Sequence, residues 1–384
     1  MFGFRLHRIS FLASAVFGVS ICGAFQALAA QPVIDSIAGV VANGTVVTIH
    51  GSSLGTKKQG PPLKYDNFEN GTVGQNLGNG WQTSGSADAG TAKLPAYDNS
   101  KPRGSSSKSV MLDFTTVPTQ YGCQFGLWPY NPGTKLYISA WAYMTTTGGE
   151  TRNMKPIRIW GDYPYNPVSP YELIGSTGFG GGWRYPCVLI DYMWGATVGY
   201  SGLIQVYSVP SKQTTKWVPD GMTKFPKDKW VHWELYADAG TPGLANGSAY
   251  WYQDGVIAAS MSNIEMLPVG YNWTQIMIGH YFAVDSNGAH CFQWWDDVYI
   301  DNTRARVEIS NSATWAGAIH REIQIPSSWS ASDIAITVNL GSFSPSDTLY
   351  LYVVDSDGNV NSMGYALTKG SGIPAPTISG ITIQ

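Results

Sequence analysis

Apolar and polar residues alternate with a period of two along most of the chain, and the spacing of an amphipathic helix is almost absent. Alternation of this kind is typical of β-strands with one buried face. Turn residues typical of β-hairpins, Asp254-Gly255 and Asn287-Gly288, lie between such runs. Many short strands with frequent turns predict an all-β sandwich or jelly roll. We expect strands at 45–50, 135–143, 156–160, 188–194, 203–207, 230–237, 249–253, 275–282 and 292–300.

The start of the chain has the pattern of an export signal. Basic residues precede an apolar run over 9–25, and the small residues Ala27-Leu28-Ala29 follow. We therefore expect 1–30 to be a signal peptide cleaved near Ala29 or Ala30, and the mature protein to be secreted, extracellular or at the cell surface. No later apolar run is long enough to span a bilayer.

Composition excludes several classes of protein. Only 13% of the 384 residues are charged, the net charge is -3, and aromatic residues, with 15 Trp and 22 Tyr, also reach 13%. This apolar and aromatic content is too high for a disordered chain. A slightly acidic chain has no basic footprint for nucleic acid. Gly, Pro, Ser, Thr and aromatic residues outnumber the residues that form helical bundles.

Cysteine usage gives little structural guidance. After the signal, the chain has Cys123, Cys187 and Cys291, which allow one disulfide and one free thiol without indicating the pair. The sequence has no CxxC or HExxH motif and no cluster of His, so it offers no support for a zinc or iron site. We expect no organic cofactor.

The two ends of the mature chain resemble parts of one domain. PVIDSIAGVVANGTVVTIHGSSLG, at 32–55, resembles the opening of a TIG/IPT immunoglobulin-like domain, and the strands after Asn302 resemble its later part. This resemblance implies a β-sandwich at 31–61 plus 304–370 that is split by an insertion. A competing interpretation makes 32–60 an N-terminal arm in front of consecutive units. The segment 371–384 is expected to be a tail or a terminal strand.

The inserted segment, 62–303, resembles concanavalin A-like jelly rolls of lectins, carbohydrate modules and polysaccharide lyases. YDNFENGTVG and WWDDVYID resemble the paired first and last strands of these folds, and KWVHWELYADAG with AYWYQDGVIAAS resembles their central strands. The fold class expected is thus a concanavalin A-like jelly-roll sandwich inserted into an immunoglobulin-like sandwich. The fold alone does not specify a function, because such folds carry many.

Strand parity places polar and aromatic side chains on common faces. In 137–143, Tyr, Ser and Trp alternate with small or aliphatic residues, which should pack between the sheets. If such faces from several strands coincide on one sheet, they form a trough of aromatic rings and hydrogen-bonding groups suited to sugars. The expected substrate-binding residues are Tyr137, Trp141, Tyr143, Trp160, Tyr207, His232 and Glu234. In the alternative interpretation, these aromatic rings are structural and only cover the sheet or pack under loops.

A resemblance to jelly-roll lyases supplies catalytic candidates. These enzymes use Arg, Gln or Asn, His and Tyr to neutralise a uronate and remove its C5 proton. Arg158, Gln205 and His280-Tyr281 follow that order along this chain, with His232 as a spare candidate. The flanking motifs differ from the family pattern, because Arg158 stands in IRIW and Gln205 is followed by Val-Tyr. In the alternative interpretation, Arg158 and Gln205 bind sugar and His280 caps a turn.

Other chemistries have weaker support. A retaining glycosidase needs two carboxylates close together, and the E-x-D-x-x-E strand of laminarinase-type jelly rolls is absent. The remaining acid pairs are Glu234 with Asp238 and Glu234 with Asp191. A Ser-His-Asp hydrolase has little support, because the sequence has no G-x-S-x-G motif. The jelly-roll resemblance also implies a structural Ca²⁺ held by Glu69 and Asp297, near Asp66 and Asp296.

The sequence therefore predicts a secreted protein that recognises an extracellular polysaccharide. A polysaccharide lyase acting on a uronate polymer is the first alternative, and a structural protein of the cell surface or of an assembly is the second. The expected partner is a polysaccharide, with cell-surface association as a further expectation, and no nucleic acid or membrane span is expected.

Overall fold

The computed structural model describes residues 30–84, 93–114, 123–128, 130–147, 151–164, 184–195, 199–209, 212–217, 226–284, 290–344 and 346–367. Regular structure there is almost entirely β-strand, which confirms the all-β fold class. The expected signal, up to Ala29, and the expected tail lie outside the described residues. Among those described, no helix has the length and apolar character needed to cross a membrane.

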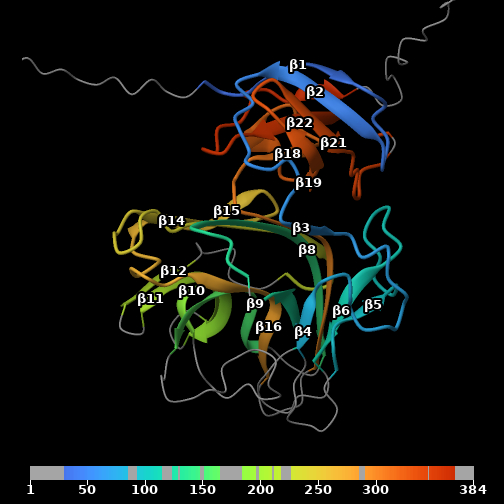
Figure 1. Ribbon diagram of the computed structural model, residues 1–384. Helices are drawn as coiled ribbons and strands as arrows, with labels where there is room; N and C mark the ends of the chain where they lie inside the picture. The colour runs from blue at the N-terminus through green and yellow to red at the C-terminus, as the bar shows by residue number, and fades with distance from the viewer. Residues whose placement is uncertain are drawn as a thin grey trace, which may run out of the picture. The chain divides into compact units, whose positions relative to one another are not determined.

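A jelly-roll sandwich of two sheets occupies the middle of the chain, and Figure 1 shows its sheets as two layers. The eight-stranded sheet has the order β15 (Val256–Ile264), β14 (Gly247–Gln253), β13 (Trp230–Asp238), β8 (Lys135–Thr147), β17 (His290–Asp301), β6 (Ser109–Asp113) and β5 (Ala96–Asp98), and β3 (Lys64–Asp66) pairs with β17. The seven-stranded sheet has the order β12 (Lys212–Trp217), β11 (Gly199–Val209), β10 (Arg184–Gly195), β9 (Thr151–Pro164), β16 (Trp273–Val284), β7 (Gln124–Leu127) and β4 (Gln82–Ser84).

Alternating side chains build the core between these two sheets. In β8, Leu136, Ile138 and Ala140 point into the core, so the residues between them face away from it. Trp233, Trp251 and Trp295 are fully buried there, which explains much of the high tryptophan content. The turn Asp254-Gly255 joins β14 to β15 with positive φ at both positions, as a tight hairpin requires.

A second, smaller β-sandwich is formed by strands from both ends of the chain. One sheet has the order β1 (Val33–Ala38), β2 (Val46–Ser52), β21 (Asp333–Thr337) and β20 (Ile325–Trp329). The other has the order β19 (Arg321–Ile323), β18 (Arg306–Ser310), β22 (Leu349–Val354) and β23 (Tyr365–Leu367). Because β2 pairs with β21, the jelly roll is inserted between two halves of this smaller sandwich. The TIG/IPT assignment of the smaller sandwich stays a prediction.

A buried ion pair joins the two chain crossings between the sandwiches. Lys57, which precedes the jelly roll, lies 2.5 Å from Asp301 at the end of β17, and both side chains are buried. Tyr299 donates a hydrogen bond to Asp301 over 2.9 Å and accepts one from Lys57 over 3.2 Å. These contacts hold the entry and exit of the insertion together.

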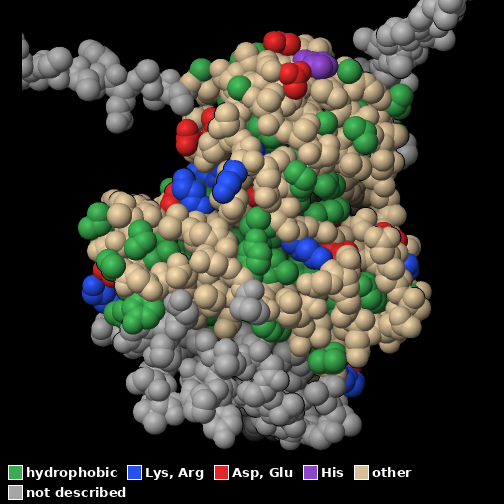
Figure 2. Space-filling view, in the orientation of Figure 1, with side chains coloured by type: hydrophobic (Ala, Val, Ile, Leu, Met, Phe, Trp, Pro, Cys, Tyr) green, Lys and Arg blue, Asp and Glu red, His purple; other side chains and the backbone are tan. Residues whose placement is uncertain are grey.

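Charged side chains are dispersed over the surface, and the three described cysteines are buried. On the face drawn in Figure 2, acidic and basic side chains are scattered among uncharged ones. Cys123, Cys187 and Cys291 are all buried and free, so the single disulfide that the sequence allowed does not form. Burial raises the pKa of Cys187 to about 12, which keeps this thiol protonated.

Candidate functional site

The residues predicted to form one trough lie on two different sheets. Tyr137, Trp141, Tyr143, His232 and Glu234 belong to β8 and β13 of the eight-stranded sheet. Arg158, Trp160, Gln205 and Tyr207 belong to β9 and β11 of the seven-stranded sheet, on the other side of the core. The single trough is therefore wrong, because strand parity distinguishes the two faces of a strand but not the sheet to which it belongs.

The smaller sandwich covers the first set. Glu234 is 1% exposed and accepts hydrogen bonds from Tyr137 over 2.7 Å, from Arg321 over 2.7 Å and from Arg306 over 3.3 Å. Glu308 binds the same two guanidinium groups from the other side. Burial alone would raise the pKa of Glu234, but Arg321 and Arg306 outweigh it and lower the pKa to about 2. This carboxylate therefore joins the jelly roll to the smaller sandwich, and its role in binding substrate stays a prediction.

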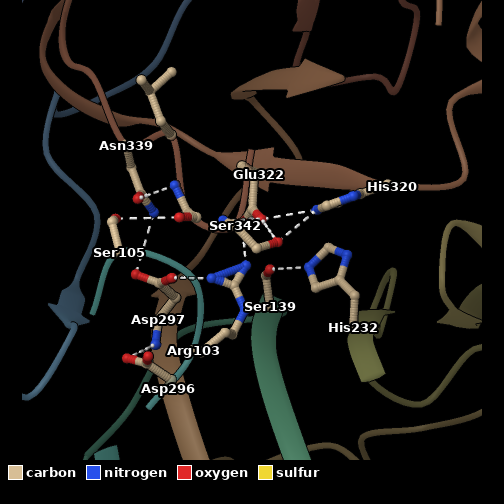
Figure 3. Close-up of polar contacts among 12 residues, drawn as sticks. Arg103, Ser105, Ser139, His232, Asp296, Asp297, His320, Glu322, Asn339 and Ser342 are labelled. Atoms are coloured by element: carbon tan, nitrogen blue, oxygen red, sulfur yellow. Dashed lines mark hydrogen bonds and ion pairs between the residues drawn. The ribbon is translucent and has the colours of Figure 1, made fainter. Parts of the chain in front are cut away.

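Trp141 and His232 are buried by a second part of this interface, and Figure 3 shows the polar contacts around His232. The two rings stack with their centroids 4.9 Å apart, and His232 Nε2 lies 2.7 Å from Ser139 Oγ. The guanidinium of Arg103 lies over the Trp141 ring, 3.9 Å from its centroid. It pairs with Asp297 over 2.8 Å and with Glu322 of the smaller sandwich. Only Tyr143 of the first set stays half-buried, against Trp230 and Trp294.

This interface makes stability depend on pH. Burial lowers the pKa of His232 to about 4, although Glu234 opposes the shift. Below the unfolded value of about 6.5, the unfolded chain binds a proton that the folded chain does not, so the stabilisation present at neutral pH is lost as the pH falls toward 4. We expect the free energy of unfolding to fall by up to about 1.4 kcal/mol per pH unit in this window. Denaturant titrations at several pH values measure it, and an unchanged slope in His232→Gln would contradict the assignment.

The second set lies on the outer face of the seven-stranded sheet, and pairing arranges it in rows across the strands. Residues directly opposite each other share a face. One row holds a guanidinium, an amide and a hydroxyl with two apolar side chains: Met277, Arg158, Leu189, Gln205 and Thr215. The next row is aromatic and uncharged: Gln275, Trp160, Cys187, Tyr207 and Gln213. Unlike the first set, these residues have no contact with the smaller sandwich among the interactions that the structure describes.

The four predicted residues of this face form two pairs in contact. The guanidinium of Arg158 lies over the Trp160 ring, 4.6 Å from its centroid. Tyr207 donates a hydrogen bond to Gln205 Oε1 over 3.2 Å. Burial raises the pKa of Tyr207 to about 12, so its hydroxyl is a donor at neutral pH and not a base. Arg158 and Gln205 are 4% and 5% exposed, so their polar groups act in a medium that screens charge weakly.

A lysine that the sequence analysis missed completes this face. Lys155 Nζ lies 3.3 Å from Asp191 Oδ2, and both side chains are buried. Regular alternation would point Lys155 into the core with Ile157, but Lys155 and Pro156 together oppose Asp191 in a bulge of β9. Pro156, inside the strand, was the feature of the sequence that could have indicated this bulge. Burial lowers the pKa of Lys155 to about 8. The negative charge of Asp191 opposes this shift, and the positive charge of Arg158 adds to it.

The remaining catalytic candidates are placed only by their backbone. His280 and Tyr281 lie in β16, where Tyr281 pairs with Lys155 after a register shift at Gly279. Gly279 has a positive φ, and a Cβ there would lie 1.9 Å from the Leu112 side chain, so the position demands glycine. The side chains of His280 and Tyr281 lie outside the described residues, and their catalytic roles stay predictions.

The expected calcium ligands take protein partners. Glu69 and Asp297 line the same cavity between the sandwiches, with a volume of about 340 Å³. Glu69 accepts backbone hydrogen bonds from Ser107 and Lys108, while Asp297 binds Arg103 and accepts a hydrogen bond from Tyr65 over 2.6 Å. Within the described ranges, no group of three or more His, Cys, Asp or Glu side chains is arranged to hold a metal ion. The calcium site stays a prediction.

Comparison with known proteins concerns the fold alone. No protein-family model and no curated protein matches the sequence. An endo-β-1,4-glucuronan lyase from the fungus Trichoderma reesei is 11% identical, with a TM-score of 0.41 over 63% of this chain and 96% of that chain. The marine PL-14 alginate lyase from Aplysia kurodai is 13% identical, with a TM-score of 0.40 over 58% and 91%. The carbohydrate recognition domain of Emp46p is 13% identical, with a TM-score of 0.38 over 62% and 99%.

Proposed function

We propose that this chain is an exported polysaccharide lyase, which binds a uronate-containing polymer on the outer face of the seven-stranded sheet. The observation that carries the proposal is Lys155, a buried amine whose pKa is about 8 and which shares this face with Arg158. A lysine with a pKa so close to neutrality is suited to act as a general base. Export is proposed from the N-terminal signal pattern.

The side chains present match the needs of β-elimination. Arg158 and the Gln205 amide are donors for the uronate carboxylate, whose neutralisation makes the C5 proton more acidic. The neutral Lys155 amine takes that proton, and the electron pair of the C5–H bond becomes the second bond between C4 and C5. The C4–O4 bond breaks with its electrons on O4. The Tyr207 hydroxyl then supplies a proton to O4 and recovers one from water.

A binding protein without catalysis is the second candidate. It is favoured by the aromatic rings of Trp160 and Tyr207 in the row beside Arg158, because sugar rings stack on such side chains. In that case Arg158 and Gln205 hold the carboxylate and no bond is broken.

A screen of uronate polymers separates the two candidates. The purified mature chain is incubated with each polymer, and the ultraviolet absorbance of a C4–C5 unsaturated uronate is followed, while affinity gels containing the same polymers measure retention. A lyase produces the absorbance and shorter oligosaccharides. Retention without product makes the chain a carbohydrate-binding protein, and absence of both overturns the two proposals together. Arg158→Ala is the control variant, and we expect it to lose both product and retention.

A further inference from the structure

The cavity between the two sandwiches is lined by residues of both and lies apart from the outer face of the seven-stranded sheet. The jelly roll contributes residues at β3, at β17 and in the loop before β6. The smaller sandwich contributes residues of β20 and β21 and of the turn before β2. The volume of about 340 Å³ is at the lower end of the range for small-molecule sites, so it suits one sugar ring better than several.

Hydrogen bonds between the two sandwiches fix one wall of this cavity. Asp297 is 2% exposed, and its Oδ1 accepts hydrogen bonds from Tyr65 over 2.6 Å and from Asn339 over 3.1 Å. Its Oδ2 accepts one from Arg103 over 2.8 Å, and Figure 3 shows Asp297 between Asn339 and Arg103. Because these bonds are made without a ligand, this wall is ordered in advance, which lowers the entropic cost of binding.

Other lining groups keep hydrogen-bonding capacity free. Asn43 accepts a hydrogen bond from the Leu340 amide at its Oδ1, and Asn67 accepts one from the Glu69 amide at its Oδ1. The Nδ2 groups of Asn43 and Asn67 have no partner among the described residues, and neither has the Thr337 hydroxyl. The cavity therefore offers two amide donors and a hydroxyl, and they come from both sandwiches.

This set of groups matches an uncharged sugar. The amide donors and the Glu69 carboxylate oxygens can exchange hydrogen bonds with neighbouring hydroxyl groups of a sugar ring. Ile325 and Val338 supply apolar area for its C–H groups. A uronate fits less well, because its carboxylate would lie beside that of Glu69, and like charges placed together in a site are unfavourable.

We infer that this cavity is a second sugar-binding site, which takes a single uncharged hexose ring. The inference goes beyond the lyase proposal and does not depend on it, because the cavity and the face that carries Arg158 are built from different sheets. Both sandwiches line the cavity, so a bound hexose stabilises the jelly roll and the smaller sandwich together.

Thermal unfolding of the purified mature chain tests the inference. The probes are the methyl glycosides of glucose, galactose and mannose, and methyl glucuronide is their acidic counterpart. We expect at least one neutral probe to raise the unfolding midpoint by a few degrees at saturation, and methyl glucuronide to leave it unchanged. No shift with any neutral probe, or an equal shift with methyl glucuronide, overturns the inference.

Variants show whether the effect arises in the cavity, since sugars at high concentration also stabilise proteins by exclusion from their surface. Asn43→Asp keeps the acceptor for the Leu340 amide and removes the free donor. We expect calorimetric titration to give a Kd at least about tenfold higher, the loss of about one hydrogen bond. Thr337→Val removes only a hydroxyl and should also weaken binding several-fold.

Two controls complete the experiment. Asn246→Asp is matched to Asn43→Asp, because Asn246 is exposed and its Oδ1 also accepts a backbone hydrogen bond, from Thr241. It should bind the hexose as the wild type does, and so should Arg158→Ala. Unchanged binding in both cavity variants overturns the inference, as does loss of hexose binding in Arg158→Ala, whereas failure of the lyase screen leaves the inference standing.

Discussion

Replacing Lys155 by methionine should reduce β-elimination by roughly 10² to 10⁴-fold, the contribution expected of a general base. Methionine keeps much of the volume of the buried lysine but has no basic group, and Arg158 remains to hold the carboxylate. Retention on an affinity gel should therefore persist while product formation is lost. Lys155→Arg should be equally inactive, since a guanidinium does not lose its proton in this pH range.

The pH profile distinguishes a base from a merely structural lysine. The neutral amine is the active form, so kcat/KM of the wild type should rise with pH and level off above about 8. Asp191 raises the pKa of Lys155, so Asp191→Asn should shift the rise to lower pH. Lys135→Met is the control, because Lys135 forms an exposed ion pair with Asp238 on the other sheet. A Lys155→Met variant with wild-type rates would refute the assignment.

Replacing Glu234 by glutamine should destabilise the protein by about 3–5 kcal/mol, the cost of breaking a buried ion pair. Glu234 lies between Arg306 and Arg321, and its loss leaves the two guanidinium groups with Glu308 alone. The two arginines come from the smaller sandwich, so the jelly roll and the smaller sandwich should lose stability together.

Guanidinium chloride titrations of the purified variant measure this effect. The matched control is Glu265→Gln, which breaks the exposed ion pair between Glu265 and Lys212 and should cost no more than about 1 kcal/mol. Equal shifts of the unfolding midpoint in the two variants would show that the buried pair contributes no more than a surface one.

Local pattern predicted the strands well. Each of the nine expected strands overlaps an observed one, from β2 to β17, because an alternating sequence has one side that avoids water in any sheet it joins. The same pattern correctly turned Ile138 inward and Trp141 away from the core. The pattern did not indicate what covers Trp141, because a side chain that points away from one core can still be buried in another interface.

The candidate site was predicted only in part. Arg158 and Gln205 lie on one face, each directly opposite Leu189, as the sequence analysis required of a binding surface. Lys155 was missed because a single bulge reverses the direction of alternation, and the bulge depends on the partner strands β10 and β16. Glu234 was assigned to the substrate because its partners, Arg306 and Arg321, are 72 and 87 residues away in sequence.

By itself, the sequence determined that this protein is an all-β sandwich with polar and aromatic residues set apart from its core. Those properties follow from the two-residue repeat of the β-strand, which acts over a few neighbouring residues. Only the tertiary structure decided which sheet each strand joined, which outer face the smaller sandwich covered, and which lysine faced Asp191. These outcomes depend on pairings between distant segments, whose geometry no short stretch of sequence contains.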